Sequence, residues 1–161
     1  AVPSHSRVLV FGKFRLVKNE YESRLGPGFF GNTAAFTLFR VDDQEEMTVR
    51  VGKDGRFSRK LSPGDYHLME IEFKHQGETI RTDTNYMIHV SGATESNYIG
   101  TLTLTAKFDR GYMGVDGVIE SFSIADNCEN ECDSILSELG VSGKSMMTSL
   151  PVWQAHFANS Q

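Results

Sequence analysis

Short segments with strand-like patterning recur along nearly the whole chain, and stretches rich in glycine, proline, asparagine and aspartate separate them. This spacing is typical of all-β sandwiches and barrels, because each short strand must turn before the next one begins. The pattern predicts roughly eight or nine strands. They cover residues 7–17, 34–41, 47–51, 56–61, 66–75, 78–81, 86–90, 98–108 and 118–125, with long loops at 19–32 and 111–117.

Alternation of apolar and polar residues within a strand predicts which side chains face the core. In 98–108, Tyr98 falls on the same face as Leu102, and the threonines beginning with Thr101 fall on the other. A threonine-lined face is typical of a sheet surface open to solvent. The alternation slips by one residue after Leu68, which indicates either a β-bulge or burial on both faces.

A helical pattern is present near the C-terminus, over 131–139. Ile135, Leu136 and Leu139 have the spacing of one helical face, and Gly140 is placed to cap the C-terminal end. The sequence therefore predicts an all-β fold, an antiparallel Greek-key β-sandwich with one short C-terminal helix.

The chain has 161 residues, which suits one domain with one core. We expect residues 1–125 to form the β-sandwich domain. Residues 126–161 would form a disulfide-containing helix and a C-terminal tail that packs on, or extends from, the same domain. No stretch approaches the roughly 18 consecutive apolar residues that a membrane-spanning helix needs. A start at Ala1 fits a processed mature end and a trimmed chain equally well, so a signal peptide or a lipid anchor stays open.

The charge balance argues against a nucleic-acid partner. The chain carries 16 Lys and Arg against 21 Asp and Glu, a formal net charge of −5, and neither sign forms a long run. The basic residues that do gather in sequence are interrupted by Asp54 and lack interleaved aromatic side chains apart from Phe57. We interpret them as a solvated strand or turn; they are Arg50, Lys53, Arg56, Arg59 and Lys60.

Two neighbouring segments carry a recognisable pattern, Lys53-Asp-Gly-Arg-Phe57 and Leu61-Ser-Pro-Gly-Asp-Tyr66. This pattern resembles that of the carboxypeptidase-regulatory-like and transthyretin-like sandwich domains, in which a D-G-x-F strand leads into an L-x-P-G-x-Y turn and strand. The resemblance covers about residues 7–108. It implies a Greek-key sandwich of the kind found as a non-catalytic module of exported proteins and outer-membrane-associated lipoproteins.

The two cysteines, Cys128 and Cys132, are four residues apart. In an exported protein this spacing predicts a local disulfide across the turn that enters the helix. Nearby acids, among them Asp126 and Asp133, would raise a thiol pKa and so disfavour thiol catalysis. The same acids leave an alternative open, a metal- or cofactor-binding loop over 126–133 that uses carboxylates for Ca²⁺ or thiolates for Zn²⁺.

Catalytic motifs are missing from the sequence. There is no G-x-S-x-G elbow, and the five histidines are dispersed without metal-binding spacing. We therefore predict no enzymatic activity, no catalytic residues and no cofactor or metal.

The tail contains apolar residues that something must cover: Met146, Met147, Trp153 and Phe157. They predict either a docking segment for a partner or packing across an open sheet face of the same domain. The leading hypothesis is a non-enzymatic, periplasmic or extracellular module, and anchoring to the membrane as a lipoprotein is left open. It would bind a protein or polysaccharide partner in a cell-surface assembly through this tail or through the loop at 19–32.

Overall fold

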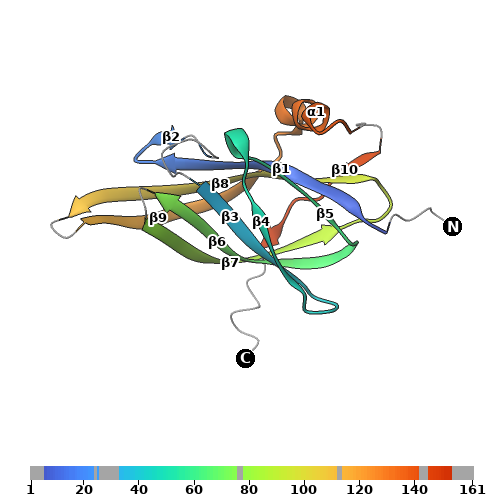
Figure 1. Cartoon of the computed structure of the whole chain (residues 1–161), viewed down its shortest axis with the longest axis horizontal. Coiled ribbons are helices and arrows are strands. Elements are labelled where there is room, and N and C mark those ends of the chain that lie inside the picture. The colour runs from blue at the N-terminus through green and yellow to red at the C-terminus, as the bar shows by residue number, and fades with distance from the viewer. Residues whose placement is uncertain are drawn as a thin grey trace.

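The computed structural model describes residues 6–23, 25, 33–75, 78–111, 114–141 and 145–153. These residues form two β-sheets packed face to face, and one α-helix lies on the outer face of one sheet (Figure 1). The predicted all-β sandwich with one short helix is confirmed. The Greek-key connection stays a prediction.

Sheet A is built around two long neighbouring strands, β1 (Val8–Lys18) and β8 (Ser96–Gly111). Two further strands pair with β1, and two pair with β8. Those of β1 are β2 (Tyr21–Ser23) and β5 (Arg56–Leu61), and those of β8 are β9 (Gly114–Ala125) and β10 (Met146–Thr148). Most pairs are antiparallel as predicted, but β1 and β10 both run parallel to β8. Sheet A is therefore mixed.

Sheet B contains five antiparallel strands in the order β11-β7-β6-β3-β4. Their bounds are β3 (Thr33–Arg40), β4 (Glu46–Arg50), β6 (Gly64–His75), β7 (Glu78–Val90) and β11 (Val152–Trp153), and a short 3-10 helix, η1 (Lys53–Gly55), leads from β4 to β5. Two strands were predicted at 78–81 and 86–90, but β7 is continuous. Its centre is held to β6 by the hydroxyl of Thr84, which donates to the carbonyl of Leu68 at 2.6 Å.

The main core fills the space between the two sheets. The side chains of the resembling segments lie in it as the pattern predicted, with Phe57, Leu61, Tyr66 and Leu68 at most 3% exposed. Phe57 packs edge-on against Phe36 of sheet B, with ring centroids 4.9 Å apart. The segments are thus explained by packing of the sandwich.

The slip in alternation after Leu68 is a β-bulge, one of the two outcomes predicted. Leu38 and Thr37 are adjacent on β3, but their partners on β6 are Leu68 and Glu70, so Met69 is an extra residue. The register of β6 against β7 shifts at the same place. There the extra residue is on β7, because Thr84 and Asn85 face Met69 alone.

A second bulge, in β8, reverses the direction of one predicted side chain. Gly100 has φ +106°, a conformation that favours glycine. Between the paired residues, β8 has Ile99 and Gly100 where β1 has Gly12 alone, so β8 carries one extra residue. Tyr98 and Thr101 consequently share the outer face of sheet A, and Leu102 points into the core. The prediction that Tyr98 shares a face with Leu102 was wrong. The Thr101 surface is also not open to solvent, since Thr101 is 1% exposed.

Helix α1 (Cys128–Glu138) covers this part of the outer face and makes a second, smaller core. Cys132, Ile135 and Leu136 pack there against Phe11 and Tyr98 of sheet A. The helix starts three residues earlier than predicted, because the apolar spacing marks only the turns that contact the sheet. No described helix has the length and apolar character needed to cross a membrane.

The C-terminal end of α1 is capped as predicted. Gly140 takes a left-handed conformation with φ +70°, its N–H donates to Ser137, and the N–H of Val141 donates to Leu136. This is a Schellman motif, and Val141 also packs against the small core. The cap turns the chain back toward the edge of sheet A.

Candidate functional site

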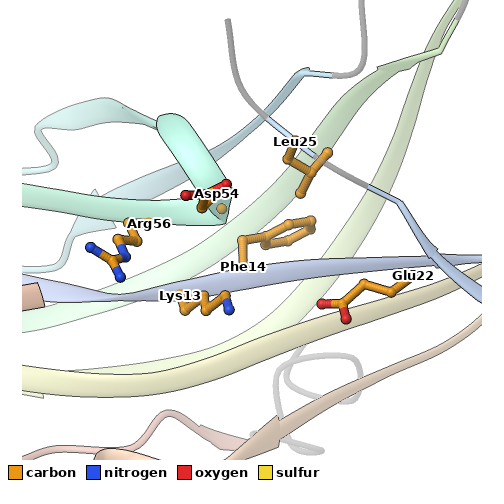
Figure 2. Close-up of a pocket in the computed structure, with 7 residues that line it drawn as sticks. Lys13, Phe14, Glu22, Leu25, Asp54 and Arg56 are labelled. Atoms are coloured by element: carbon orange, nitrogen blue, oxygen red, sulfur yellow. The ribbon is translucent and has the colours of Figure 1, made fainter. Parts of the chain in front are cut away.

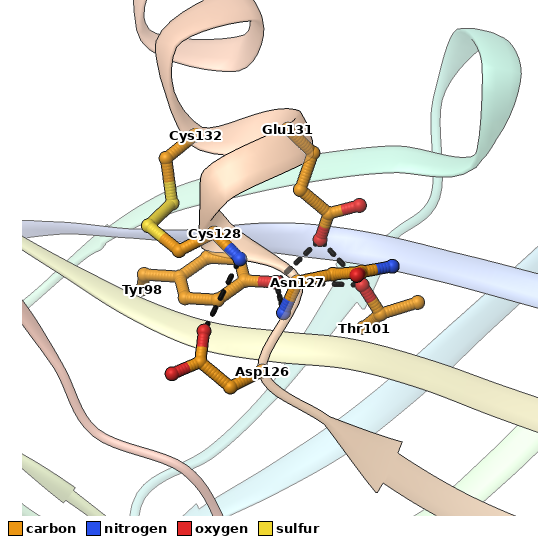
Figure 3. Close-up of a disulfide and its surroundings, with 7 residues drawn as sticks. All are labelled: Tyr98, Thr101, Asp126, Asn127, Cys128, Glu131 and Cys132. Atoms are coloured by element: carbon orange, nitrogen blue, oxygen red, sulfur yellow. Dashed lines mark hydrogen bonds between the residues drawn. A yellow bond between two sulfur atoms is a disulfide. The ribbon is translucent and has the colours of Figure 1, made fainter.

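The disulfide between Cys128 and Cys132 is present, as predicted. Both cysteines lie in the first turns of α1, with Cα atoms 4.7 Å apart, so the bridge closes the helix start itself (Figure 3). The carboxylate of Asp126 accepts a hydrogen bond from the N–H of Cys128 at 3.1 Å. Cys132 is buried against the sheet. The disulfide and the Asp126 hydrogen bond thereby constrain the first turn of the helix.

A polar cluster below the disulfide attaches the helix to sheet A. One carboxylate oxygen of Glu131 accepts hydrogen bonds from the hydroxyls of Tyr98 and Thr101, each at 2.5 Å (Figure 3). The Tyr98 oxygen in turn accepts the N–H of Asn127 at 3.1 Å. Sequence reasoning missed this cluster, because it depends on the bulge at Gly100.

The electrostatics of the cluster stabilise the protonated tyrosine. Burial, together with the hydrogen bond to the Glu131 carboxylate, raises the pKa of Tyr98 to about 12. The hydroxyl therefore stays a donor at neutral pH. The N–H of Asn127 and the hydroxyl of Thr101 favour loss of the proton, but burial and the Glu131 carboxylate outweigh them, so the hydroxyl is suited to anchoring.

The far end of the helix is held by Arg56 of β5. The guanidinium contacts the carboxylate of Glu138 and donates to the hydroxyl of Ser134 at 2.8 Å. The acidic helix is thus held at this end by one cation of sheet A. Of the basic residues predicted to be solvated, four are exposed and Arg56 is partly covered by the helix; the exposed ones are Arg50, Lys53, Arg59 and Lys60.

The arrangement of the acidic segment opposes the alternative of a metal-binding loop. Both cysteine sulfurs are used in the disulfide, so they cannot act as thiolate ligands. The carboxylates of Asp126 and Glu131 accept hydrogen bonds from the chain itself. Within the described ranges, no three side chains of His, Cys, Asp or Glu are grouped so that they could hold a metal ion.

The C-terminal segment 145–153 is built into the sandwich. The carbonyl of Ser145 accepts hydrogen bonds from both the N–H and the hydroxyl of Ser96. Further along, the side chain of the fully buried Asn97 accepts the hydroxyl of Ser149 at 3.2 Å and also contacts the backbone of Ser91. The segment leaves sheet A as β10 and joins sheet B as β11 (Figure 1).

The last two described residues project an apolar surface. Val152 and Trp153 are 59% and 57% exposed although both belong to β11. The ring of Trp153 packs edge-on against Tyr86, with centroids 5.4 Å apart, and Tyr86 packs the same way against Phe122 of sheet A, at 5.3 Å. We call Phe122, Tyr86 and Trp153 the aromatic row. It extends from the core to the surface.

The four tail residues predicted to contact a partner differ in their surroundings. Met146 packs against the small core under α1, and Met147 is half-buried. Trp153 is exposed, and Phe157 lies outside the described residues. The tail therefore combines packing on its own domain with an exposed end, the two readings that the sequence left open.

A pocket of about 380 Å³ lies beside the start of the long loop (Figure 2). Its floor is apolar, from Phe14 and Leu25, and its rim carries charges of both signs. The lining residues are Lys13, Phe14, Glu22, Leu25, Asp54, Gly55 and Arg56. The rim charges are partly engaged: Arg56 contacts α1, and a hydrogen bond from Arg15 lowers the pKa of Glu22. Among the described residues that line this pocket there is no nucleophile paired with a base.

A second pocket, also of about 380 Å³, brings together the residue types of a hydrolase triad. Asp65 and His89 are hydrogen-bonded at 2.7 Å, and Ser149 also lines this pocket. However, the Ser149 hydroxyl donates to Asn97, and the Asp65–His89 pair is largely exposed. A triad requires the histidine to accept the serine proton and a buried acid to orient it. Neither condition is met.

Comparisons with known proteins leave the family open. The chain matches no protein-family model and no curated protein sequence. A solved structure of a DUF3823 family protein from Parabacteroides merdae ATCC 43184 aligns with 71% of this chain and 58% of its own, at 14% identity and a TM-score of 0.31. That similarity is too low to transfer a fold or a function. The resemblance to carboxypeptidase-regulatory-like and transthyretin-like domains stays a prediction.

Proposed function

We propose that this chain is a non-enzymatic binding module of an exported assembly and that it contacts a protein partner through Val152 and Trp153. The observation that carries the proposal is the exposure of these two side chains on a strand held in place by β7. An aromatic ring fixed in this way loses little conformational freedom on binding, and tryptophan is prominent among residues that dominate binding energies.

The surroundings of Trp153 support a contact surface rather than a packing defect. Behind it, Tyr86 and Phe122 continue the aromatic row, so the ring rests on side chains that pack against the main core. Val152 adds a second exposed apolar side chain beside the ring, and the apolar core of a protein interface would bury both. The Cys128–Cys132 disulfide supports an oxidising, exported location for the module.

The experiment places a photo-cross-linking residue at position 153 of the full chain in cells of its source. The matched control carries it at Tyr21, an aromatic residue that is 78% exposed on a different strand. We expect one defined protein adduct from position 153 and none from position 21. The same adduct from both positions would contradict the proposal.

The adduct then supplies the partner for a binding measurement with purified components. We expect Trp153→Ala to raise the dissociation constant at least about tenfold, which corresponds to a loss of about 1.4 kcal/mol of binding free energy. Tyr21→Ala should leave it unchanged. An unchanged affinity for Trp153→Ala would show that these side chains are not the contact surface.

A further inference from the structure

The pocket that holds Asp65 and His89 borders the proposed contact surface. Its volume is about 380 Å³, and Val152 belongs both to its lining and to that surface. The other lining residues come from β6, β7 and the tail; they are Asp65, Met87, Ile88, His89, Ser149 and Leu150. A partner seated on Val152 therefore lies at the mouth of this pocket.

The strand register places four of these side chains on the outer face of sheet B. Asp65 lies opposite His89, and Met87 lies opposite Val152. Ile88, between Met87 and His89, is buried in the main core, so its two neighbours point away from the core. The carboxylate and the two apolar side chains thus open onto the same surface.

The walls of the pocket are largely apolar. Met87 is half-buried, Leu150 lies against Gly100 of β8, and Val152 is 59% exposed. Walls of this kind suit a chain of methylene groups, because burying apolar surface away from water is favourable. By themselves they would accept any aliphatic side chain.

One side of the pocket carries a carboxylate, and no lysine or arginine is among the described lining residues. The Nδ1 of His89 donates to Oδ1 of Asp65 at 2.7 Å, and within the described ranges Oδ2 of Asp65 has no hydrogen-bond partner. The Asp65 side chain is 59% exposed, so Oδ2 is accessible from outside. A group bound at this oxygen must donate a hydrogen bond, and a cation would do so most strongly.

The turn between β3 and β4 adds negative charge nearby. The N–H of Val41 donates to the carbonyl of Asp65, so this turn begins beside the same strand. Residues 40–45 contain one cation, Arg40, whose guanidinium already donates to the carboxylate of Asp43. The acids of the turn are Asp42, Asp43 and Glu45. This end of sheet B therefore favours a cation over an anion.

We propose that the pocket accepts a lysine or arginine side chain of the protein partner, an inference that rests on the proposed function. The methylene groups of this side chain would lie along Met87, Leu150 and Val152, and its charged end would reach Oδ2 of Asp65. Lysine and arginine combine the two parts, an apolar stem and a charged end. The partner would then carry a basic residue next to the group that contacts Trp153.

A small guanidinium compound tests the pocket without the partner. n-Butylguanidinium has an aliphatic stem and a cationic end, whereas n-butylurea has nearly the same shape without the charge. We expect n-butylguanidinium to shift the methyl NMR signals of Met87 and Val152 in the full chain, saturably and with a dissociation constant in the millimolar range. n-Butylurea should bind about three- to fivefold more weakly, as expected when a partly exposed ion pair is lost.

Two variants each remove one negative charge. Asp65→Asn keeps the shape and an acceptor for His89, and it should lower the affinity for n-butylguanidinium to that for n-butylurea. The matched control is Asp133→Asn, which removes the same charge from an exposed position of α1 on the other sheet and should change neither affinity. Circular dichroism verifies that both variants are folded.

Three results with these compounds would overturn the proposal. The first is the absence of saturable shifts at Met87 and Val152. The second is an equal affinity of the wild type for n-butylguanidinium and n-butylurea, and the third is an affinity for n-butylguanidinium that Asp65→Asn leaves unchanged.

The partner captured at position 153 tests the same pocket in the complex. We expect Asp65→Asn to raise the dissociation constant at least about fivefold and to weaken the dependence of binding on salt. Asp133→Asn should leave both unchanged. An equal loss of affinity in the two variants would reflect net charge alone and would contradict a cation in the pocket.

Comparison with Trp153→Ala separates the pocket from the proposed function. If Trp153→Ala weakens binding and Asp65→Asn does not, the contact surface stands and the cation pocket is wrong. If Trp153→Ala leaves binding unchanged, the proposed function is wrong, and so is the assignment of the pocket to that partner, even where n-butylguanidinium binds.

Discussion

At the scale of single residues, Tyr98 and Thr101 attach helix α1 to the outer face of sheet A. Their hydroxyls donate to the same oxygen of Glu131, and both side chains are essentially buried. A hydrogen bond to a charged acceptor in such a place contributes more than one in water. Small changes here should therefore be measurable.

Replacing Thr101 by valine keeps the shape and removes the hydroxyl. We expect Thr101→Val to lower the free energy of unfolding by about 1–3 kcal/mol, because Glu131 loses one of its donors. The control Thr103→Val lies one pleat further along the same face and should change stability by less than about 0.5 kcal/mol. Chemical denaturation of the wild type and both variants measures these changes. A midpoint of Thr101→Val equal to that of Thr103→Val would show that the Thr101 hydroxyl contributes nothing.

The raised pKa of Tyr98 predicts how stability changes in alkali. An unfolded tyrosine loses its proton near pH 10, whereas Tyr98 in the folded chain keeps it to about pH 12. The folded state thus binds this proton more tightly, so its contribution is complete below pH 10 and is lost as the pH rises toward 12. The loss over this range should be at most about 3 kcal/mol.

Denaturation of wild type and Tyr98→Phe across this pH range isolates the contribution of the one hydroxyl. The difference in unfolding free energy between the two proteins should shrink as the pH increases. A difference that is constant with pH would mean that Tyr98 titrates like an unfolded tyrosine.

At the scale of elements, the disulfide constrains the start of α1, while Glu131 and Arg56 hold the helix to the sheet. In the chain-entropy account, a bridge that closes so short a loop stabilises by about 2 kcal/mol. We expect the double variant Cys128→Ser, Cys132→Ser to lose about that much in thermal or chemical unfolding, with the helix still docked. Reduction of the wild type should cause the same loss, and an unchanged midpoint after both treatments would contradict the prediction.

Elements were predictable where their signals are local. Alternation in β1 and β6, the slip beside Met69 and the cap at Gly140 depend on neighbouring residues, and the structure has them where the sequence indicated. The helix start at Cys128 was missed because its first turn shows little of the apolar period that marks the later ones.

Features set by distant residues could not be predicted. The bulge at Gly100 exists because β8 must match β1, which lies some 90 residues away in the chain, so the outward direction of Tyr98 and its contact with Glu131 were hidden. The strands β10 and β11 have three and two residues, too few to show a period. The apolar residues of the tail pointed to the candidate surface around Trp153. The contact of Trp153 with Tyr86 could not be predicted, because the two residues are distant in the sequence.

At the scale of the whole molecule, the tail joins the two sheets on the side where β7 and β9 face each other. Asn97 holds it there, and replacing its side chain should free the segment. We expect Asn97→Ala to lower the free energy of unfolding by about 1–3 kcal/mol and to expose residues 145–153 to limited proteolysis. Asn130→Ala is the control, because Asn130 is an exposed helix residue whose amide makes one long contact of 3.4 Å. Equal cleavage of the two variants would show that Asn97 is not the anchor.

The crossing of the tail from β8 to β7 also determines how the molecule opens. The segment is bonded to both sheets, through the N–H of Ser149 to the carbonyl of Tyr98 and through the pairing of Val152 with Met87. One of these backbone connections must break before the two sheets can separate on this side. The two pairs should therefore form one cooperative unit, and amide hydrogen exchange at Ser149 and in β11 should report a single opening free energy. The segment from Ser149 to Val152 acts as the clasp of the sandwich, and the stability of the clasp governs how often the core meets water.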